Sequence, residues 1–130
     1  MQKSIINPWQ WQDTLGYAQA IEVSHVKHTL YCAGQAAMNA DGQPVAADMA
    51  GQISLCFDNL ETILQQADYS LTNVVRLNFY TTSIEQFFAS YDQIMSRLGT
   101  AGCAPASTLT EVRALAFPEL LVEIEATAVK

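Results

Sequence analysis

Two long stretches of the chain repeat apolar residues at the spacing of an α-helix. Across residues 48–67 apolar side chains recur every three or four positions over about five turns, at Met49, Ile53, Cys56, Phe57, Leu60, Ile63, Leu64 and Ala67. A second apolar stripe follows Ser83, which has Gln86 in place for a capping box, and precedes Gly99, a residue type typical of helix ends. The sequence therefore predicts helices over 48–67 and 83–99, each with one face in the core.

Other segments alternate apolar and polar residues with the period of two that is typical of β-strands. These segments are residues 17–24, 28–35, 74–81, 106–115 and 118–130. The first two are separated by a short turn and predict a β-hairpin, whereas an Asp-Gly pair and a proline predict a loop at 39–44. The resulting order, β-β-α-β-α-β-β, predicts an α+β fold whose mixed sheet has both helices on one face.

The face of this sheet without helices is predicted to be too apolar to remain in water. It is expected to carry Tyr31, Arg76, Tyr80, Leu109, Leu121 and Val129 among polar groups. Only 15% of the residues are charged while 50% are apolar, which is a small charged share for a chain of 130 residues. Both observations indicate that this face packs against further copies of the chain.

Composition excludes several classes of function. No apolar run approaches about 18 residues, so no membrane span is predicted, and the absence of a signal peptide predicts a cytoplasmic protein. Three cysteines without C-x-x-C spacing and only two histidines argue against a disulfide framework and against a metal site. The net charge of −7, with scattered basic residues, argues against nucleic acid as a partner. We expect a single domain over residues 1–130 without a cofactor.

Four stretches together resemble the Rid family, also called YjgF or L-PSP, from about Leu15 to the C-terminus. They are GYAQAIEV at 16–23, YCAGQAAMNADGQPV at 31–45, DNLETILQQADYSLTNVVRLNFYTT at 58–82 and LLVEIEATAVK at 120–130. The resemblance implies a chorismate-mutase-like fold in a homotrimer with a barrel-like core and ligand clefts between subunits. It also implies hydrolysis of amino-acid-derived imines or enamines to a keto acid and ammonia.

The resemblance assigns roles to individual residues. Glu123, on the polar side of the last strand, matches the family's functional glutamate, which positions the hydrolytic water or moves protons. Tyr17 matches a tyrosine that lines the cleft, although the family's preceding proline is missing here. Gly34 and Gln35 match a Gly-Gln pair of the family. Glu125 is expected farther along the same face of the strand, as a structural carboxylate.

Two positions depart from the family's pattern. Tyr91 falls roughly where many deaminating members have an asparagine, and Ser107 stands where the family has the arginine that grips the substrate carboxylate. Serine has neither the charge nor the forked geometry of arginine, and neither Arg76 nor Arg113 is placed to replace it. In a cleft that contains Glu123 and no cation, an anionic ligand about 4 Å from the carboxylate is repelled by about 4 kcal/mol. This repulsion lowers the affinity for the anion roughly a thousandfold. The expected ligand is therefore neutral or amine-bearing.

Three functions remain open at this point. The first is a hydrolase or deaminase for an imine, carbonyl or amide compound, with Glu123 as acid or base. The second is a non-catalytic trimer that binds a small molecule, and the third is an ordinary 2-imino acid deaminase. Ribonuclease activity, also described for the family, is disfavoured because the chain's negative charge repels phosphate.

The remaining candidate residues are given lesser roles. Ser107 is expected to form hydrogen bonds rather than act as a nucleophile, because no histidine or lysine is placed to activate it. Cys103 lacks the neighbouring cation or histidine that a catalytic thiol needs. Trp9 and Trp11 are expected to pack in a strand or edge segment, with capping of the ligand as the alternative.

Overall fold

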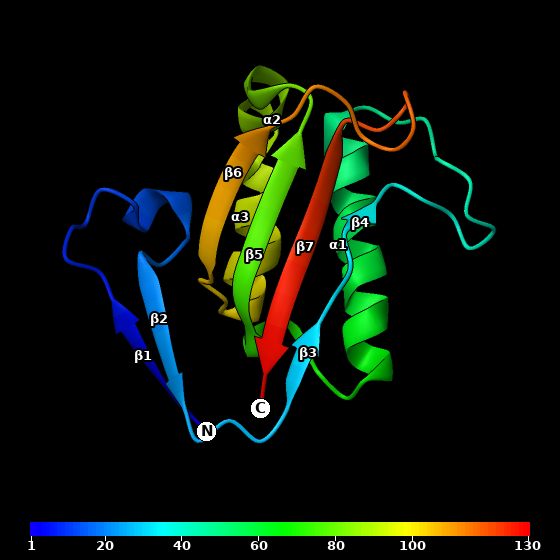
Figure 1. Ribbon diagram of the computed structural model, residues 1–130. Coiled ribbons are helices and arrows are strands. Elements are labelled where there is room, and N and C mark those ends of the chain that lie inside the picture. The colour runs from blue at the N-terminus through cyan, green and yellow to red at the C-terminus, as the bar shows by residue number, and fades with distance from the viewer.

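The computed structural model describes residues 1–130 and places helices against one face of a mixed sheet (Figure 1). The strands are β1 (Gln2–Ile6), β2 (Ala20–Ser24), β3 (Thr29–Tyr31), β4 (Gln35–Ala36), β5 (Val74–Thr81), β6 (Ala106–Glu111) and β7 (Val122–Val129). The helices are α1 (Met49–Gln66), α2 (Ile84–Ala89) and α3 (Tyr91–Ala101), with 3-10 turns η1 (Asp13–Leu15) and η2 (Leu71–Asn73). The predicted fold class, α+β with a mixed sheet, is confirmed.

The main sheet has the strand order β3-β7-β5-β6, and β4 continues along the edge of β7 that β3 begins. Only β5 and β6 run parallel in this sheet. Strands β1 and β2 pair with each other and stand beside β6 (Figure 1), linked to it by one parallel bridge between Ala18 and Ala106. The predicted hairpin of 17–24 with 28–35 is therefore wrong, because β2 pairs with β1 whereas β3 pairs with β7.

Long-range hydrogen bonds explain why that hairpin does not form. His25 adopts a positive φ of 55°, which turns the chain after β2. The backbone N–H groups of Lys27 and His28 then both donate to the carbonyl of Lys130. These bonds direct the following residues along the C-terminal strand β7 rather than back along β2.

The first predicted helix forms the centre of the core. Asp48 caps α1 by accepting a hydrogen bond of 2.9 Å from the backbone N–H of Gly51. The buried side chains of the helix are Met49, Gln52, Ile53, Cys56, Phe57, Leu60 and Leu64. On β7 the buried partners are Val122, Ile124, Ala126 and Ala128, as the alternation of that segment predicts. Glu123 and Glu125 consequently point to the opposite face of the sheet.

The second predicted helix is interrupted and ends later than expected. Ser83 caps α2 by accepting a hydrogen bond of 3.2 Å from the backbone N–H of Gln86, but a break at Ser90 separates α2 from α3. Gly99 lies within α3, so its prediction as the end of the helix is wrong. Gly102 ends the helix with a φ of 64°, a left-handed conformation that glycine adopts without steric cost.

The face without helices, turned toward the viewer in Figure 1, is more polar than predicted. It carries Arg76, Asn78, Tyr80, Glu123 and Glu125. Tyr31 is 81% exposed. Leu109, however, stands opposite Phe79 in the sheet and packs with it on the helix side. Leu121 also packs against that core, and Val129 is buried at the end of β7. The prediction that Leu109 and Leu121 lie on the face without helices, called the open face below, is therefore wrong, whereas the alternation of β7 keeps Val129 on the face of Glu123 and Glu125.

Gln52 fixes the segment that leads into β7, and we expect Gln52→Ala to destabilise the fold. The side chain is fully buried, donates to the carbonyls of Ala47 (3.0 Å) and Glu119 (2.8 Å), and accepts from the N–H of Leu121 (2.8 Å). Removing it leaves buried backbone groups without partners, so the free energy of unfolding should fall by about 3 kcal/mol. Urea denaturation at one fixed protein concentration measures this difference.

The exposed Gln66 on the same helix provides the matched control. Gln66→Ala should change the free energy of unfolding by less than about 0.5 kcal/mol. Equal effects of the two substitutions would contradict the structural role given to Gln52.

Candidate functional site

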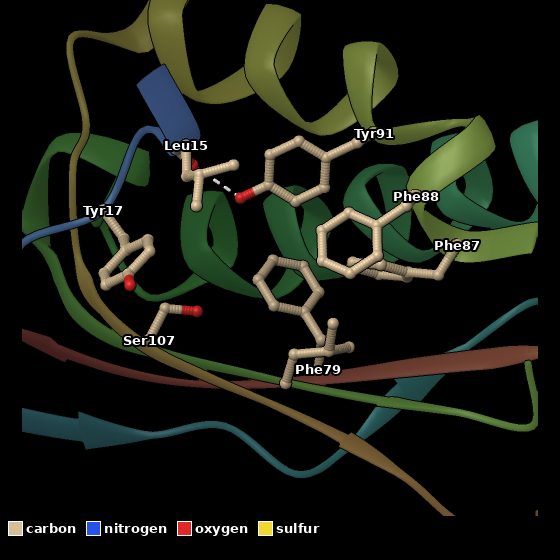
Figure 2. Close-up of a pocket in the computed structure, with 8 residues that line it drawn as sticks. Leu15, Tyr17, Phe79, Phe87, Phe88, Tyr91 and Ser107 are labelled. Carbon is tan, nitrogen blue, oxygen red and sulfur yellow. Dashed lines mark hydrogen bonds between the residues drawn. The ribbon is translucent and has the colours of Figure 1, made fainter. Parts of the chain in front are cut away.

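An aromatic hollow of about 180 Å³ lies between β6, the α2–α3 break and the segment after η1 (Figure 2). It is lined by Leu15, Tyr17, Phe79, Phe87, Phe88, Tyr91, Ser107 and Leu109, and we call it the aromatic pocket. Three of the predicted site residues, Tyr17, Tyr91 and Ser107, are thus brought together on the helix side of the sheet. Phe87 and Phe88 were missed because the sequence pattern assigned their apolar stripe to the core, and Leu109 was missed because it was expected on the face without helices.

The segment that carries Tyr17 is held against α3 by close contacts. Gly16 has a φ of 74°, and a Cβ atom there would lie 2.6 Å from Sδ of Met95. The Tyr91 hydroxyl donates a hydrogen bond of 2.5 Å to the carbonyl of Leu15, drawn dashed in Figure 2. Burial raises the pKa of Tyr91. The hydroxyl therefore stays protonated as a donor and keeps this segment next to the pocket.

Ser107 is the one lining residue that is not hydrophobic. Its Oγ donates a hydrogen bond of 2.7 Å to the carbonyl of Leu77 on β5. The hydroxyl proton is therefore already donated in a hydrogen bond, whereas the lone pairs of the oxygen can still accept one. Arg76 does not line the pocket; it donates to Thr108 Oγ1 (2.8 Å) on the other face of the sheet. Arg113 is exposed beyond the end of β6 and does not line the pocket either.

Glu123 and Gly34 form a second group, on the opposite face of the sheet. Glu123 stands beside Tyr80 in the register of β7 with β5, and it is half-buried. Gly34 lies in the link between β3 and β4, where a Cβ atom would be 2.3 Å from Oε1 of Glu123 and 2.8 Å from its Cδ. The missing side chain of Gly34 therefore leaves the space that the carboxylate occupies.

Gln35 belongs to neither group. Its amide donates a hydrogen bond of 3.2 Å to the carbonyl of Ala33. The side chain lines a shallow groove along α1, together with Asn59 and Ile63. Within one chain, the predicted site residues therefore fall into three separate places.

Glu125 accepts two hydrogen bonds on the open face. They come from the Tyr80 hydroxyl (2.5 Å) and the Asn78 amide (3.1 Å). The Tyr80 bond, followed by the Asn78 bond, holds the pKa of Glu125 below its ordinary value, and the bond to Glu125 raises the pKa of Tyr80. Alternation along β5 already places Asn78 and Tyr80 on one face of the sheet, so the sequence contained the information that these two side chains lie together.

The depressed pKa of Glu125 predicts a pH-dependent contribution to stability. Because the folded state favours the ionised carboxylate, the contribution is fully present above the ordinary pKa and is lost as pH falls through the lower, folded-state pKa. The difference in unfolding free energy between the native protein and Glu125→Gln should therefore shrink on acidification. We expect it to stay below about 1 kcal/mol, since solvent screens the pair. Denaturation curves between about pH 3 and pH 8 measure it; a difference that grows on acidification would contradict the assignment.

Cys103 and the two tryptophans lie outside the pocket lining. Cys103 is buried, and its Sγ lies 3.8 Å from the carbonyl of Val74. Burial raises the pKa of Cys103 to about 11, so it is a thiol near neutral pH.

Trp9 and Trp11 are 57% and 61% exposed, so the prediction of a packed segment is wrong for them. The Trp11 ring meets the Tyr17 ring edge-on at 6.4 Å, beside the pocket.

The described residues contain no group of three His, Cys, Asp or Glu side chains arranged to hold a metal ion. No helix combines the length and the apolar character that crossing a bilayer requires.

Comparison with known proteins places the chain in a family. The family model described as endoribonuclease L-PSP matches residues 12–130. A RutC family protein from Pyrococcus horikoshii is 30% identical over 115 residues, which are 88% of this chain and 86% of the relative. The chain therefore belongs to the L-PSP family, and the Rid resemblance drawn from its sequence is confirmed.

Solved structures agree with this assignment. A protein of unknown function of the Rid family from Yersinia pestis, YyfB, is 36% identical and has a TM-score of 0.86, with 100% of both chains covered. A protein from Thermotoga maritima, described as a putative endoribonuclease, is 29% identical and has a TM-score of 0.70, with 88% of this chain and 86% of that chain covered. These structures share the α+β fold described above.

Proposed function

We propose that this protein is a cytoplasmic, homotrimeric hydrolase of small imine, carbonyl or amide compounds that are neutral or amine-bearing. In this proposal each site lies between two subunits. One subunit contributes the aromatic pocket, with Tyr17, Tyr91 and Ser107, and its neighbour contributes Glu123 with Gly34. Family membership supports the class of reaction, and the geometry of the single chain supports the division of the site.

The observation that carries the proposal is the separation of Glu123 from the pocket. Strand β5 lies between β6, which bears Ser107, and β7, which bears Glu123. Neighbouring strands are about 4.8 Å apart, so the two backbones are roughly 10 Å apart. The two side chains also point to opposite faces of the sheet. If both act on one substrate, Glu123 must come from a second copy of the chain.

The open face supports association of the copies. Tyr31 is exposed there, next to the Tyr80–Glu125 hydrogen bond and the side chain of Arg76. Aromatic residues and arginine are enriched in protein–protein interfaces relative to the rest of the protein surface. Packing of three copies through these faces would bring each Glu123 toward a neighbouring chain.

The proposed reaction adds water across a carbon–nitrogen double bond. Glu123 accepts a proton from water as the water oxygen forms a bond to the imine carbon. That proton passes to the nitrogen and gives a carbinolamine. Glu123 then transfers the hydroxyl proton of the carbinolamine to its amino group, the carbon–nitrogen bond breaks as the carbonyl double bond forms, and a carbonyl compound and ammonia leave. General base catalysis of this kind contributes typically about 10²–10⁴-fold in rate. No arginine lines the pocket, so nothing there compensates the charge of a substrate carboxylate.

A panel of imines generated in solution tests the proposal through ammonia release by the native protein. Neutral and amine-bearing imines should be turned over, and their carboxylate-bearing counterparts should have values of kcat/KM lower by roughly a thousandfold. Equal values across neutral and anionic imines would overturn the charge argument. They would instead indicate an ordinary 2-imino acid deaminase.

The second candidate is a trimer that binds a small molecule without turnover. The observation in its favour is the Ser107 hydroxyl, whose proton is held by the Leu77 carbonyl. Saturable ligand binding with no ammonia release from any imine of the panel would favour this candidate. Ribonuclease activity is disfavoured, because the net charge of −7 repels phosphate.

A further inference from the structure

We propose that the aromatic pocket binds an uncharged six-membered ring, so that the substrate is a ring-bearing compound with its reacting group at the pocket mouth. The statement about the reacting group rests on the proposed function, whereas ring binding stands on the pocket alone.

The size of the pocket fits one ring. Its volume is about 180 Å³. A buried apolar cavity of about 150 Å³ is known to take up benzene. The aromatic pocket therefore accommodates one six-membered ring with a small substituent, and it leaves no space for a second ring.

The walls present aromatic rings at steep angles to one another. Phe79 and Phe87 meet with ring centroids 5.4 Å apart and an interplanar angle of 61°, and Phe87 meets Tyr91 at 5.7 Å with the same angle. Phe88 is 50% exposed, so it belongs to the outer wall rather than to the core. A ligand ring that enters such a cluster can make edge-to-face contacts, which add about 0.5–1.5 kcal/mol per pair in proteins.

The polar groups of the pocket are few and carry no charge. Tyr91 and Ser107 already donate their hydroxyl protons to the carbonyls of Leu15 and Leu77. What remains is the acceptor oxygen of Ser107 and the hydroxyl of Tyr17, which Figure 2 shows at the same end of the pocket. A charged group bound here would lose water without gaining a partner of opposite charge. A neutral polar substituent needs only these two hydroxyls.

Trp11 provides a direct readout of binding. Its ring lies edge-on to Tyr17 at 6.4 Å, whereas Trp9 is the only other tryptophan of the chain. In a Trp9→Phe background the tryptophan fluorescence comes from Trp11 alone. A ligand that contacts Tyr17 should change that fluorescence without any need for turnover.

The test is a titration of this full-length protein with matched small molecules. Benzamide is the neutral ring probe, benzoate and benzylammonium carry opposite charges on nearly the same shape, and acetamide lacks the ring. Benzamide should bind roughly tenfold or more tighter than acetamide, because burial of the ring supplies most of the affinity. It should also bind at least about tenfold tighter than benzoate, whose carboxylate finds no positive partner in the pocket. Benzylammonium should bind more tightly than benzoate, because its charge is compatible with Glu123 of the neighbouring subunit at the pocket mouth. Cyclohexanecarboxamide should bind between benzamide and acetamide, since it fills the space without an aromatic face.

Two variants locate the binding. Ser107→Phe fills the pocket and should abolish benzamide binding. Ser96→Phe makes the same change at an exposed position of α3 that does not line the pocket, and it should leave binding unchanged. Circular dichroism and thermal unfolding confirm that both variants are folded.

The outcomes separate this inference from the proposed function. Acetamide binding as tightly as benzamide, or benzoate binding more tightly than benzamide or benzylammonium, would overturn the neutral-ring proposal, even if acyclic neutral imines are hydrolysed. Selective benzamide binding that Ser107→Phe abolishes would support it, even if no imine of the panel is turned over. In that case the hydrolase proposal fails while the pocket's ligand class stands.

Discussion

Glu123→Gln should lower kcat for imine hydrolysis by about 10²–10⁴-fold, while the affinity of the aromatic pocket for benzamide stays unchanged. The amide of glutamine has nearly the shape of the carboxylate, but it does not accept a proton from water near neutral pH. The pocket lies on the other face of the sheet from Glu123 in the same chain, so its walls are not altered. Steady-state ammonia release and the fluorescence titration measure the two effects separately.

Two further variants control for this effect. Glu125→Gln makes the same chemical change two residues along the same face of β7 and should reduce kcat far less, because Glu125 is engaged with Tyr80 and Asn78. Gly34→Ala keeps the carboxylate but places a Cβ atom 2.3 Å from Oε1 of Glu123, which must then move. It should lower kcat with little change in thermal stability. A larger loss with Glu125→Gln than with Glu123→Gln would contradict the role of Glu123.

Ser107→Arg should reverse the charge preference of the site. A guanidinium in the pocket would offer a carboxylate two parallel hydrogen bonds and cancel the repulsion from Glu123. We expect the ratio of kcat/KM for anionic over neutral imines to rise by roughly a thousandfold. The arginine side chain also occupies the pocket, so benzamide binding should weaken. Paired kinetics on one imine with and without a carboxylate give this ratio.

Ser107→Met is the matched control for the arginine. Methionine also fills the pocket with a long, flexible side chain but carries no charge. It should weaken benzamide binding without any gain on anionic imines. An equal gain with Met and Arg, or no gain with either, would show that the missing charge at position 107 does not determine the substrate preference.

The fold could be predicted where the pattern is local and strong. The stripe over residues 48–67 is long and has Asp48 as a cap, and the alternation around Glu123 is regular, so both elements formed as expected. Strand β1 was missed because all five of its residues are exposed and leave no apolar alternation. The pairing of β3 with β7 depends on bonds to the carbonyl of Lys130, about 100 residues away in sequence. No local turn signal reports such a partner.

The candidate site could be predicted only in part. The family resemblance selected Tyr17, Tyr91 and Ser107, which are far apart in the sequence and lie together in the aromatic pocket. Phe87 and Phe88 were both assigned to the core stripe of the second helix, but Phe87 is buried whereas Phe88 is 50% exposed. Helical periodicity does not separate the two, because adjacent residues of α1 such as Cys56 and Phe57 are both buried. The position of Glu123 relative to the pocket was not predictable, because it depends on strand order and, in our proposal, on a second chain.

The most direct test of the divided site mixes two inactive variants. Glu123→Gln retains the pocket, and Ser107→Phe retains the glutamate. The two proteins are unfolded together and refolded, with each variant refolded alone as the control. In the proposal each site takes its pocket from one subunit and its glutamate from the next. A site is then complete when its pocket comes from a Glu123→Gln subunit and its glutamate from a Ser107→Phe subunit. Random mixing of equal amounts of the two variants gives this combination at about a quarter of the sites. We therefore expect about a quarter of the native imine hydrolysis rate in the mixture and at most about a hundredth of it in either variant alone. A mixture as inactive as its components, despite exchange of subunits shown by native mass spectrometry, would contradict the account.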